Sequence, residues 1–242
     1  MQNRLKILLP VIAFLLIAEA CHKSGSVTVA PTALNIINAI PNSQPIIPIL
    51  GTQAPIQYFG NAQSIGYTGS AVYSPLNGSN TLYIVQNTDT TAIDPKFELF
   101  NGTIDLAAGG IYSFFLAGDS VAPDTLFVQD QIPAYSDSSA GVRFVNLTTG
   151  SMPMSVTIEG NPATQAEFSN LAYKTVSSWK KYLSSSAVPG YYNFTIRDEL
   201  TGDSLTSFSW NYALFKNNTL VISGSEVIGS NEPIQVFQMN NF

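Results

Sequence analysis

A strand–turn–strand pattern occurs twice in this 242-residue chain, and the repetition limits the folds open to it. The first copy is Leu-Asn-Ile-Ile-Asn at 34–38, a Pro/Asn/Ser turn, and Pro-Ile-Ile-Pro-Ile-Leu-Gly at 45–51. The second copy is Val-Arg-Phe-Val-Asn at 142–146, a Thr/Gly/Ser turn, and Pro-Met-Ser-Val-Thr-Ile-Glu-Gly at 153–160. The offset of about 108 residues exceeds the length of a solenoid repeat and suits a β-sandwich domain. The pattern therefore predicts two tandem domains.

Short apolar runs separated by turn residues also make up the rest of the chain after residue 33. Turn signals such as Pro41-Asn42 and Gly109-Gly110 supply the fixed or positive φ angles that tight turns require. A sustained 3.6-residue apolar period is missing from this region, apart from a short turn near 162–168. The pattern predicts strands at 34–40, 46–50, 56–59, 81–86, 97–100, 111–116 and 125–129, and again at 142–147, 154–159, 173–182, 191–197, 204–215, 219–223 and 234–239.

These two series of strands predict an all-β protein made of two tandem β-sandwich domains. We place the first domain at residues 33–135 and the second at 141–242. The Asp/Ser-rich segment at 133–141 forms the expected boundary, because domain boundaries fall in exposed polar linkers.

The N-terminal segment predicts export and a membrane anchor. Arg4 and Lys6 precede an apolar run at 7–18, which is too short for the roughly 20 residues that span a bilayer and is typical of a signal peptide. We expect the signal peptide to be residues 1–20, because Cys21 and the residues before it resemble a bacterial lipobox. In that case Cys21 is acylated and 21–32 form a tether. The alternative is plain secretion after cleavage at Ala18-Glu19-Ala20, which fits ordinary signal peptidase.

The repeated first hairpin carries a resemblance to a known family. A strand ending in Asn, a polar turn and an alternating strand ending in Gly, at 36–51 and 144–160, resemble the DUF4397 domain. That resemblance implies immunoglobulin-like β-sandwich modules in an exported Bacteroidota-type lipoprotein, and the family has no established activity. The expected location is the outer membrane, on its periplasmic side or at the cell surface.

Charge and residue usage exclude several functions. The formal charge of −6 leaves no basic stripe for nucleic acid. His22 is the only histidine and Cys21 the only cysteine, which excludes nucleophile–histidine catalysis, the usual zinc and copper sites, and an intrachain disulfide. Carboxylates such as Glu159 and Asp198 leave a glycosidase-type enzyme as the last-ranked hypothesis, although their strand-end and loop positions favour structural roles. We predict no catalytic residue, no metal site, no cofactor and no enzymatic activity.

Aromatic side chains are the best candidates for a binding site, because sugars and polar partners pack on flat rings. The Gly- and Ser-rich stretch from Tyr67 to Tyr73 forms the expected binding edge, and Trp179 is the third candidate. Our first hypothesis is a non-enzymatic envelope lipoprotein that serves as a binding or structural module. The alternative is a carbohydrate-binding lipoprotein of a polysaccharide-uptake system. Expected partners are the membrane, through the acyl group on Cys21, and a glycan or an envelope protein.

Modification is a further expectation. Four Asp-Ser/Thr tripeptides resemble the O-glycosylation acceptor of exported Bacteroidota proteins. The acceptor residues predicted by this resemblance are Thr90, Ser120, Thr125 and Ser204.

Overall fold

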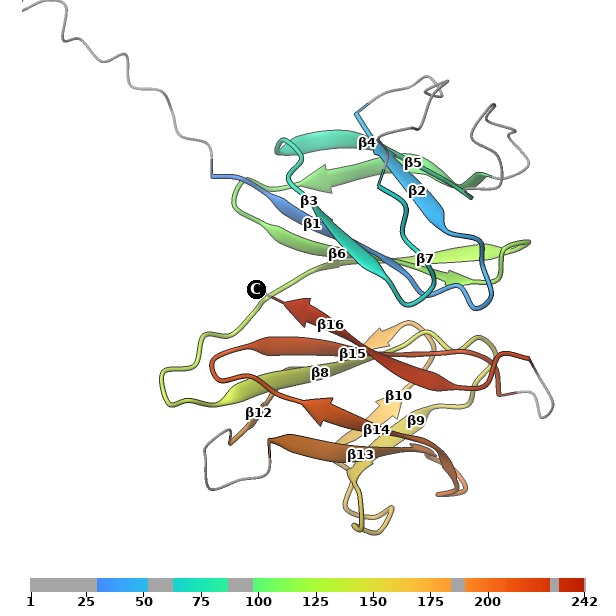
Figure 1. The fold of residues 1–242 in the computed structure, drawn as a ribbon, viewed down its shortest axis with the longest axis vertical. Helices are drawn as coiled ribbons and strands as arrows, with labels where there is room; N and C mark the ends of the chain where they lie inside the picture. The colour runs from blue at the N-terminus through green and yellow to red at the C-terminus, as the bar shows by residue number, and fades with distance from the viewer. Residues whose placement is uncertain (1–29, 52–62, 87–97, 184–189, 227–230, 242) are drawn as a thin grey trace, which may run out of the picture. The chain divides into compact units, whose positions relative to one another are not determined.

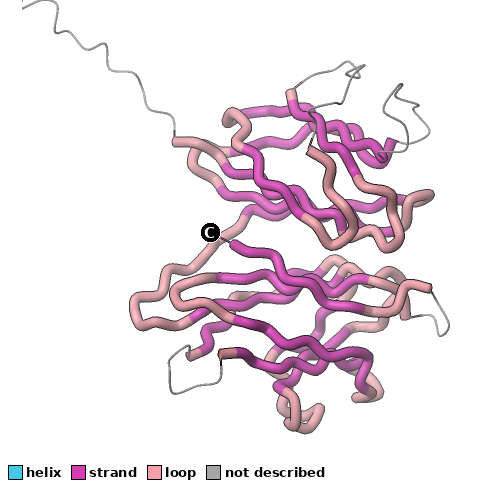
Figure 2. The backbone as a smooth tube through the Cα atoms, in the orientation of Figure 1, coloured by secondary structure: helices cyan, strands magenta, loops and turns pink. Residues whose placement is uncertain are grey.

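The computed structural model describes residues 30–51, 63–86, 98–183, 190–226 and 231–241. The regular secondary structure in these ranges consists of β-strands. The strands form sheets that pack in a sandwich-like arrangement (Figure 1 and Figure 2). The predicted all-β sandwich fold is therefore confirmed. Among the described residues, a search for helices long and apolar enough to cross a bilayer finds none.

The first half of the chain forms two sheets. Its strands are β1 (Ala33–Asn38), β2 (Ile46–Leu50), β3 (Ser70–Tyr73), β4 (Gly78–Gln86), β5 (Glu98–Leu106), β6 (Ile111–Gly118) and β7 (Pro123–Gln129). One sheet has the order β3-β1-β6-β7, with β1 antiparallel to β3 and parallel to β6, and the other has the order β2-β4-β5. An apolar core that includes Leu34, Ile84 and Phe114 lies between the two sheets.

The second half repeats this topology and adds an edge strand, β10 (Phe168–Leu171). Its strands are β8 (Ala140–Asn146), β9 (Met154–Ile158), β10 (Phe168–Leu171), β11 (Thr175–Val176), β12 (Lys180–Tyr182), β13 (Tyr191–Asp198), β14 (Ser204–Asn211), β15 (Asn217–Ser223) and β16 (Gln235–Asn241). One sheet has the order β11-β8-β15-β16 with β12 also paired to β8, and the other has the order β10-β9-β13-β14. β8 and β15 are parallel, as β1 and β6 are. The core between these sheets surrounds the fully buried Trp210.

A repeated hydrogen-bond network explains the repeated Asn at the end of the first strand. Asn38 Nδ2 donates to Ser43 Oγ (3.0 Å) and to the Ile65 carbonyl (3.2 Å), and its Oδ1 accepts from the Ile40 N–H (3.2 Å). The equivalent Asn146 bonds Ser151 Oγ (3.1 Å), the Leu171 carbonyl (2.9 Å) and the Thr148 N–H (2.9 Å). Both Asn side chains are fully buried, so each amide satisfies backbone groups that the turn would otherwise leave unpaired.

The two halves also share an apolar cluster. Ile37 and Phe115 of the first half pack with Val145 and Val221 of the second. The central strands of the two sheets that meet here, β1 and β6 in the first half and β8 and β15 in the second, are consequently buried on both faces. Every residue of β8 and β15 is buried. Strand pairing nevertheless stays within each half. Independent folding of the predicted domains 33–135 and 141–242 stays a prediction.

Several strand boundaries differ from the prediction. The strand expected at 173–182 is broken into β11 and β12, and the strand expected at 204–215 ends at Asn211. β3 and β10 were not predicted, because each has only four residues and both lie among Gly or polar residues. Asn101-Gly102, which has the sequence of a turn, lies inside β5 because β4 pairs with it throughout. The strand predicted at 56–59 lies outside the described residues.

Candidate binding sites

Trp179 lines a hollow at one edge of the second sandwich. The hollow has a volume of about 290 Å³ and lies where the edge strand β10 of one sheet approaches β11 and β12 of the other. Its lining combines the indole with short hydroxyl side chains and a pair of charged groups: Glu167, Phe168, Ser169, Leu171, Thr175, Ser177, Ser178, Trp179 and Lys180.

A β-bulge places Trp179 in this hollow. Val176 pairs with Val145 and Lys180 pairs with Val142, so three residues at 177–179 stand opposite only two residues of β8. The Ser177 hydroxyl accepts the Phe144 N–H (2.8 Å) and thereby satisfies the backbone at the irregularity. A bulge re-aims the side chains of the bulged strand, and here it turns Trp179 out of the regular alternation.

The Arg143 guanidinium packs against the Trp179 ring. The guanidinium lies 4.7 Å from the ring centroid and is itself buried, with Arg143 only 3% exposed. Its Nη2 forms an ion pair with Asp130 Oδ1 (2.5 Å), and its Nε donates to Thr219 Oγ1 (2.8 Å). Ser113 of the first half donates to the other oxygen of Asp130 (2.6 Å). A cation–π contact to a fixed, desolvated guanidinium restricts the orientation of the indole.

The charges in the Trp179 hollow neutralise one another. Lys180 Nζ forms an ion pair with Glu167 Oε2, which also accepts a hydrogen bond from the Tyr182 hydroxyl (2.9 Å). Burial raises the pKa of Tyr182, and the neighbouring Glu167 raises it further, so the phenol stays protonated and serves as a donor. The hollow therefore offers an aromatic wall and hydroxyl groups with little net charge, which suits a neutral polar ligand.

Neither predicted tyrosine joins Trp179 in the hollow. The Tyr67 hydroxyl donates to Ser223 Oγ (3.3 Å) and accepts from Gln235 Nε2 (2.8 Å), and its ring meets Phe237 edge-on at 6.5 Å. Tyr67 therefore joins the two halves. Tyr73 packs against the first core, and its buried hydroxyl has no hydrogen-bond partner among the described residues. Burial accordingly raises the pKa of Tyr73.

The other predicted site residues are spread over the chain. Cys21 and Thr90 lie outside the described residues. Ser120 and Ser204 are exposed, and Thr125 is half-buried with its N–H bonded to Asp124 Oδ1 (2.7 Å). Lipidation and O-glycosylation at these positions stay predictions. Within the part of the chain that the structure describes, no cluster of three or more His, Cys, Asp or Glu side chains is placed to hold a metal ion.

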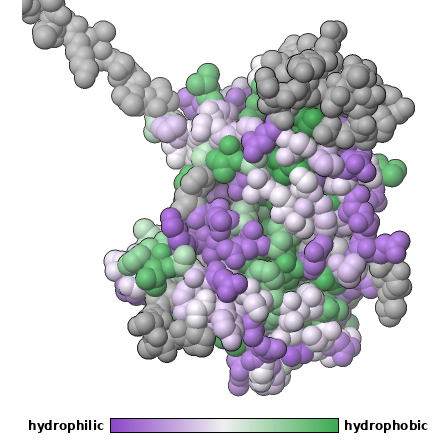
Figure 3. All heavy atoms as spheres, viewed as in Figure 1, coloured by the Kyte–Doolittle hydropathy of each residue, from purple (hydrophilic) through white to green (hydrophobic). Residues whose placement is uncertain are grey.

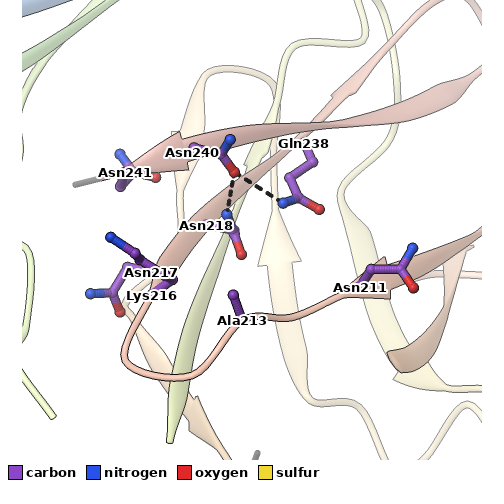
Figure 4. Close-up of a pocket in the computed structure, with 8 residues that line it drawn as sticks. All are labelled: Asn211, Ala213, Lys216, Asn217, Asn218, Gln238, Asn240 and Asn241. Carbon is purple, nitrogen blue, oxygen red and sulfur yellow. Dashed lines mark hydrogen bonds between the residues drawn. The ribbon is translucent and has the colours of Figure 1, made fainter. Parts of the chain in front are cut away.

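A second hollow, lined mainly by amides, was missed by the sequence analysis. It has a volume of about 460 Å³ and lies between the β14–β15 loop and the end of β16, with Asn211, Ala213, Lys216, Asn217, Asn218, Gln238, Asn240 and Asn241 around it (Figure 4). The signal in the sequence is the pair of Asn-Asn doublets at 217–218 and 240–241, which stand opposite each other in the β15–β16 ladder. Composition alone does not reveal that two such doublets pair.

Comparisons with known proteins identify no relative. Neither the family models nor the curated proteins contain a match to this chain, so membership of the DUF4397 family stays a prediction. Among solved structures, similarity is found to a family CBM26 module from Eubacterium rectale in complex with maltoheptaose (7% identity, 86% of this chain and 97% of that chain, TM-score 0.27). It is also found to an alpha-glucan-binding streptococcal virulence factor (8%, 78% and 92%, 0.26) and to a candidate adhesin from Bacteroides ovatus (11%, 88% and 95%, 0.25). TM-scores this low assign no function.

Proposed function

We propose that this protein is a non-enzymatic binding module that holds a neutral carbohydrate in the Trp179 hollow. The observation that supports this proposal is the indole ring, which the bulge at 177–179 brings into the hollow and the buried Arg143 holds in place. An aromatic ring of fixed orientation stacks on the apolar face of a sugar without first losing rotamer freedom. Hydroxyl groups such as those of Ser169 and Thr175 are suitable partners for the sugar hydroxyls.

Binding is favoured over catalysis by how the acidic side chains are used. Glu159 accepts a hydrogen bond from Asn193 Nδ2 (2.7 Å), and Asp198 Oδ1 accepts the N–H groups of Leu200 and Thr201 (2.8 Å each) in the turn after β13. Each carboxylate therefore has a structural role close to its own strand end. Glu167 is engaged by Lys180 and Tyr182.

The proposed setting is the cell envelope. Residues 1–20 would be the signal peptide, Cys21 the acylated residue, and 21–32 the tether that carries the module at the outer membrane, on the periplasmic side or at the surface. Detergent phase partitioning of the native protein tests this setting. Recovery in the aqueous phase, with an unmodified thiol at the mature N-terminus, would remove the anchor from the proposal.

A glycan array with the full chain, followed by titration calorimetry, tests the binding function. We expect neutral oligosaccharides to bind, and Trp179→Ala to weaken the binding at least about tenfold. Stacking of a nucleic-acid base on one aromatic ring contributes on the order of 1–3 kcal/mol, and stacking of a sugar face on the indole is the analogous contact. Tyr191→Ala is the matched control, because Tyr191 is a half-exposed aromatic on β13 that does not line the hollow. Equal binding by the wild type and Trp179→Ala, or no neutral ligand at millimolar concentration, would contradict the proposal.

A further inference from the structure

The amide-lined hollow has one cationic side chain among the described residues that line it. Lys216 is the only charged residue among the described residues that line it, and it forms no ion pair within the described part of the chain. The whole chain has a formal charge of −6, whereas the described lining of this pocket includes an ammonium group and no carboxylate. An ammonium group at a concave site favours an anionic ligand.

Hydrogen bonds fix the orientations of Asn218 and Asn240 in the hollow. The Trp210 indole can only donate, and it donates to Asn218 Oδ1 (2.9 Å), so Asn218 Nδ2 faces the other way and donates to Asn240 Oδ1 (2.9 Å). Gln238 Nε2 donates to the same Asn240 oxygen (3.1 Å), and Figure 4 shows both bonds. This chain of hydrogen bonds begins at the fully buried Trp210 indole. Within the described residues it leaves Asn240 Nδ2 as a donor and Gln238 Oε1 as an acceptor for a ligand.

The loop beside the hollow is strained and apolar. Phe215 has a φ of +62° and is 52% exposed, although a bulky side chain rarely adopts this conformation. Its N–H donates to the Ser139 carbonyl (3.1 Å), which holds the loop between Ala213 and Lys216 in place. Figure 3 shows hydrophilic side chains gathered near the C-terminal end of β16, beside a hydrophobic strip between β14 and β16. Strained residues of this kind cluster at ligand sites.

Gly141 of β8 allows Asn217 of β15 to pack closely against it. A Cβ at Gly141 would lie 2.0 Å from Asn217 Oδ1, so only glycine fits there. Asn217 is consequently buried, with its Nδ2 bonded to the Pro133 carbonyl (2.8 Å), and it anchors the strand that carries Asn218. Asn217 and Asn218 are thus held by buried contacts, which preorganise this part of the hollow.

We propose that the amide-lined hollow binds an acidic carbohydrate, in which a uronic acid carboxylate pairs with Lys216 and neighbouring hydroxyls pair with Asn240, Gln238 and Asn211. A sugar hydroxyl both donates and accepts, and it therefore matches an alternating array of amide donors and acceptors. The carboxylate of the ligand supplies a counter-ion for the Lys216 ammonium group. This site is separate from the Trp179 hollow, whose charged residues already pair with each other.

Titration calorimetry of the full chain with trigalacturonic acid, and with its methyl ester as the uncharged counterpart, tests this proposal. We expect the acid to bind at least about tenfold more tightly than the ester, with an affinity that falls as salt concentration rises. Lys216→Met should abolish this difference, and Asn240→Ala should weaken both ligands. Lys181→Met is the matched control, because Lys181 already pairs with Asp137 and does not line the hollow.

Three outcomes would overturn the proposal. The first is equal affinity for the acid and the ester, and the second is an acid affinity that Lys216→Met leaves unchanged. The third is loss of acid binding in Trp179→Ala, which would assign this ligand to the other hollow. Retained acid binding in Trp179→Ala supports a separate site, and it does so even where neutral sugars fail to bind.

Discussion

The sheets that contain β1 and β8 have the same strand topology in the two halves of the molecule, but they differ at one edge. In the first half, β3 pairs with β1 without a break, from Leu34 opposite Tyr73 to Ile37 opposite Ser70. In the second half, the corresponding partners of β8 are the two short strands β11 and β12. Between Val176 and Lys180 the edge has three residues, whereas the equivalent stretch of β3, between Ser70 and Tyr73, has two. That extra residue creates the bulge and brings Trp179 over Arg143. A one-residue insertion at an edge strand is therefore enough to distinguish a plain sandwich edge from a candidate binding site.

The halves also differ at the interface between them. Arg143 and Asn35 occupy equivalent positions on the first strand of each copy, 108 residues apart, and both are buried. Arg143 satisfies its guanidinium with Asp130, Thr219 and the Trp179 ring. Asn35 Oδ1 has no hydrogen-bond partner among the described residues. The same position thus holds a satisfied charge in one copy and an unsatisfied amide oxygen in the other.

The largest expected effect is at this pair of positions. Arg143→Met leaves Asp130 buried without its counter-ion and should cost about 3–5 kcal/mol of unfolding free energy. Asn35→Val removes an unsatisfied oxygen and should change stability by less than about 1 kcal/mol. Urea unfolding of the two variants measures the difference. A double variant, Arg143→Met with Asp130→Asn, should recover part of the loss, and equal losses in the two single variants would contradict the assigned roles.

The repeated Asn network should give equal effects in the two copies. Asn38→Ala and Asn146→Ala each remove the hydrogen bonds to three partners at a fully buried position. Each should lower the unfolding free energy by about 2–3 kcal/mol, because backbone groups are left unpaired. Ser43→Ala and Ser151→Ala each remove only one of the three partners, and they should therefore lower stability less. A much smaller loss in one copy than in the other would show that the networks are not equivalent in energy.

Removal of the bulge should separate binding from stability. Deletion of Ser178 restores the residue count of the first half, so Trp179 should leave the Arg143 guanidinium and neutral sugars should bind at least about tenfold more weakly, about 1.4 kcal/mol. Ser178→Ala keeps the bulge and should bind as the wild type does. Glycan titration and thermal unfolding are measured together. Unchanged sugar affinity in the deletion variant would disconnect the bulge from the site.

The smallest expected effect is a pH dependence of the contact between the halves. Asp124 of β7 accepts hydrogen bonds from Lys174 Nζ (2.8 Å) and the Tyr173 hydroxyl (3.2 Å) of the second half. Burial would raise the pKa of Asp124, but the hydrogen bonds from Lys174 and the Thr125 N–H outweigh it and lower the pKa. On the same contact, burial and Asp124 raise the pKa of Tyr173 to about 12.

A lowered folded-state pKa sets the direction of this pH dependence. The stabilisation is fully present above the unfolded-state pKa of Asp, about 3.9, and is lost as pH falls through the folded-state value. Asp124→Asn should therefore reduce the loss of stability on acidification. The change should stay below about 1 kcal/mol, because both side chains are about a third exposed or more and solvent screens them. Identical acid unfolding curves for the wild type and Asp124→Asn would rule out this contribution.

Much of the architecture follows from local chemistry that is visible in the sequence. Apolar runs of strand length, interrupted by Gly, Pro and Asn, predicted the all-β class and most of the strands, because side-chain alternation and turn geometry are short-range properties. The recurrence of Asn38 and Asn146 marked the two copies before any contact was known. Trp179 could be singled out as a large aromatic in a polar segment.

Only the tertiary structure decided where the candidate sites lie. The bulge at 177–179 depends on the register between β8 and its edge partners, and register is a long-range property that the local sequence does not carry. The partner of Arg143 across the interface, the use of Tyr67 between the halves, and the pairing of the two Asn doublets likewise depend on strands far apart in the chain. Residue type and spacing determined the elements of this protein, whereas the pairing and packing of those elements determined which side chains meet a ligand.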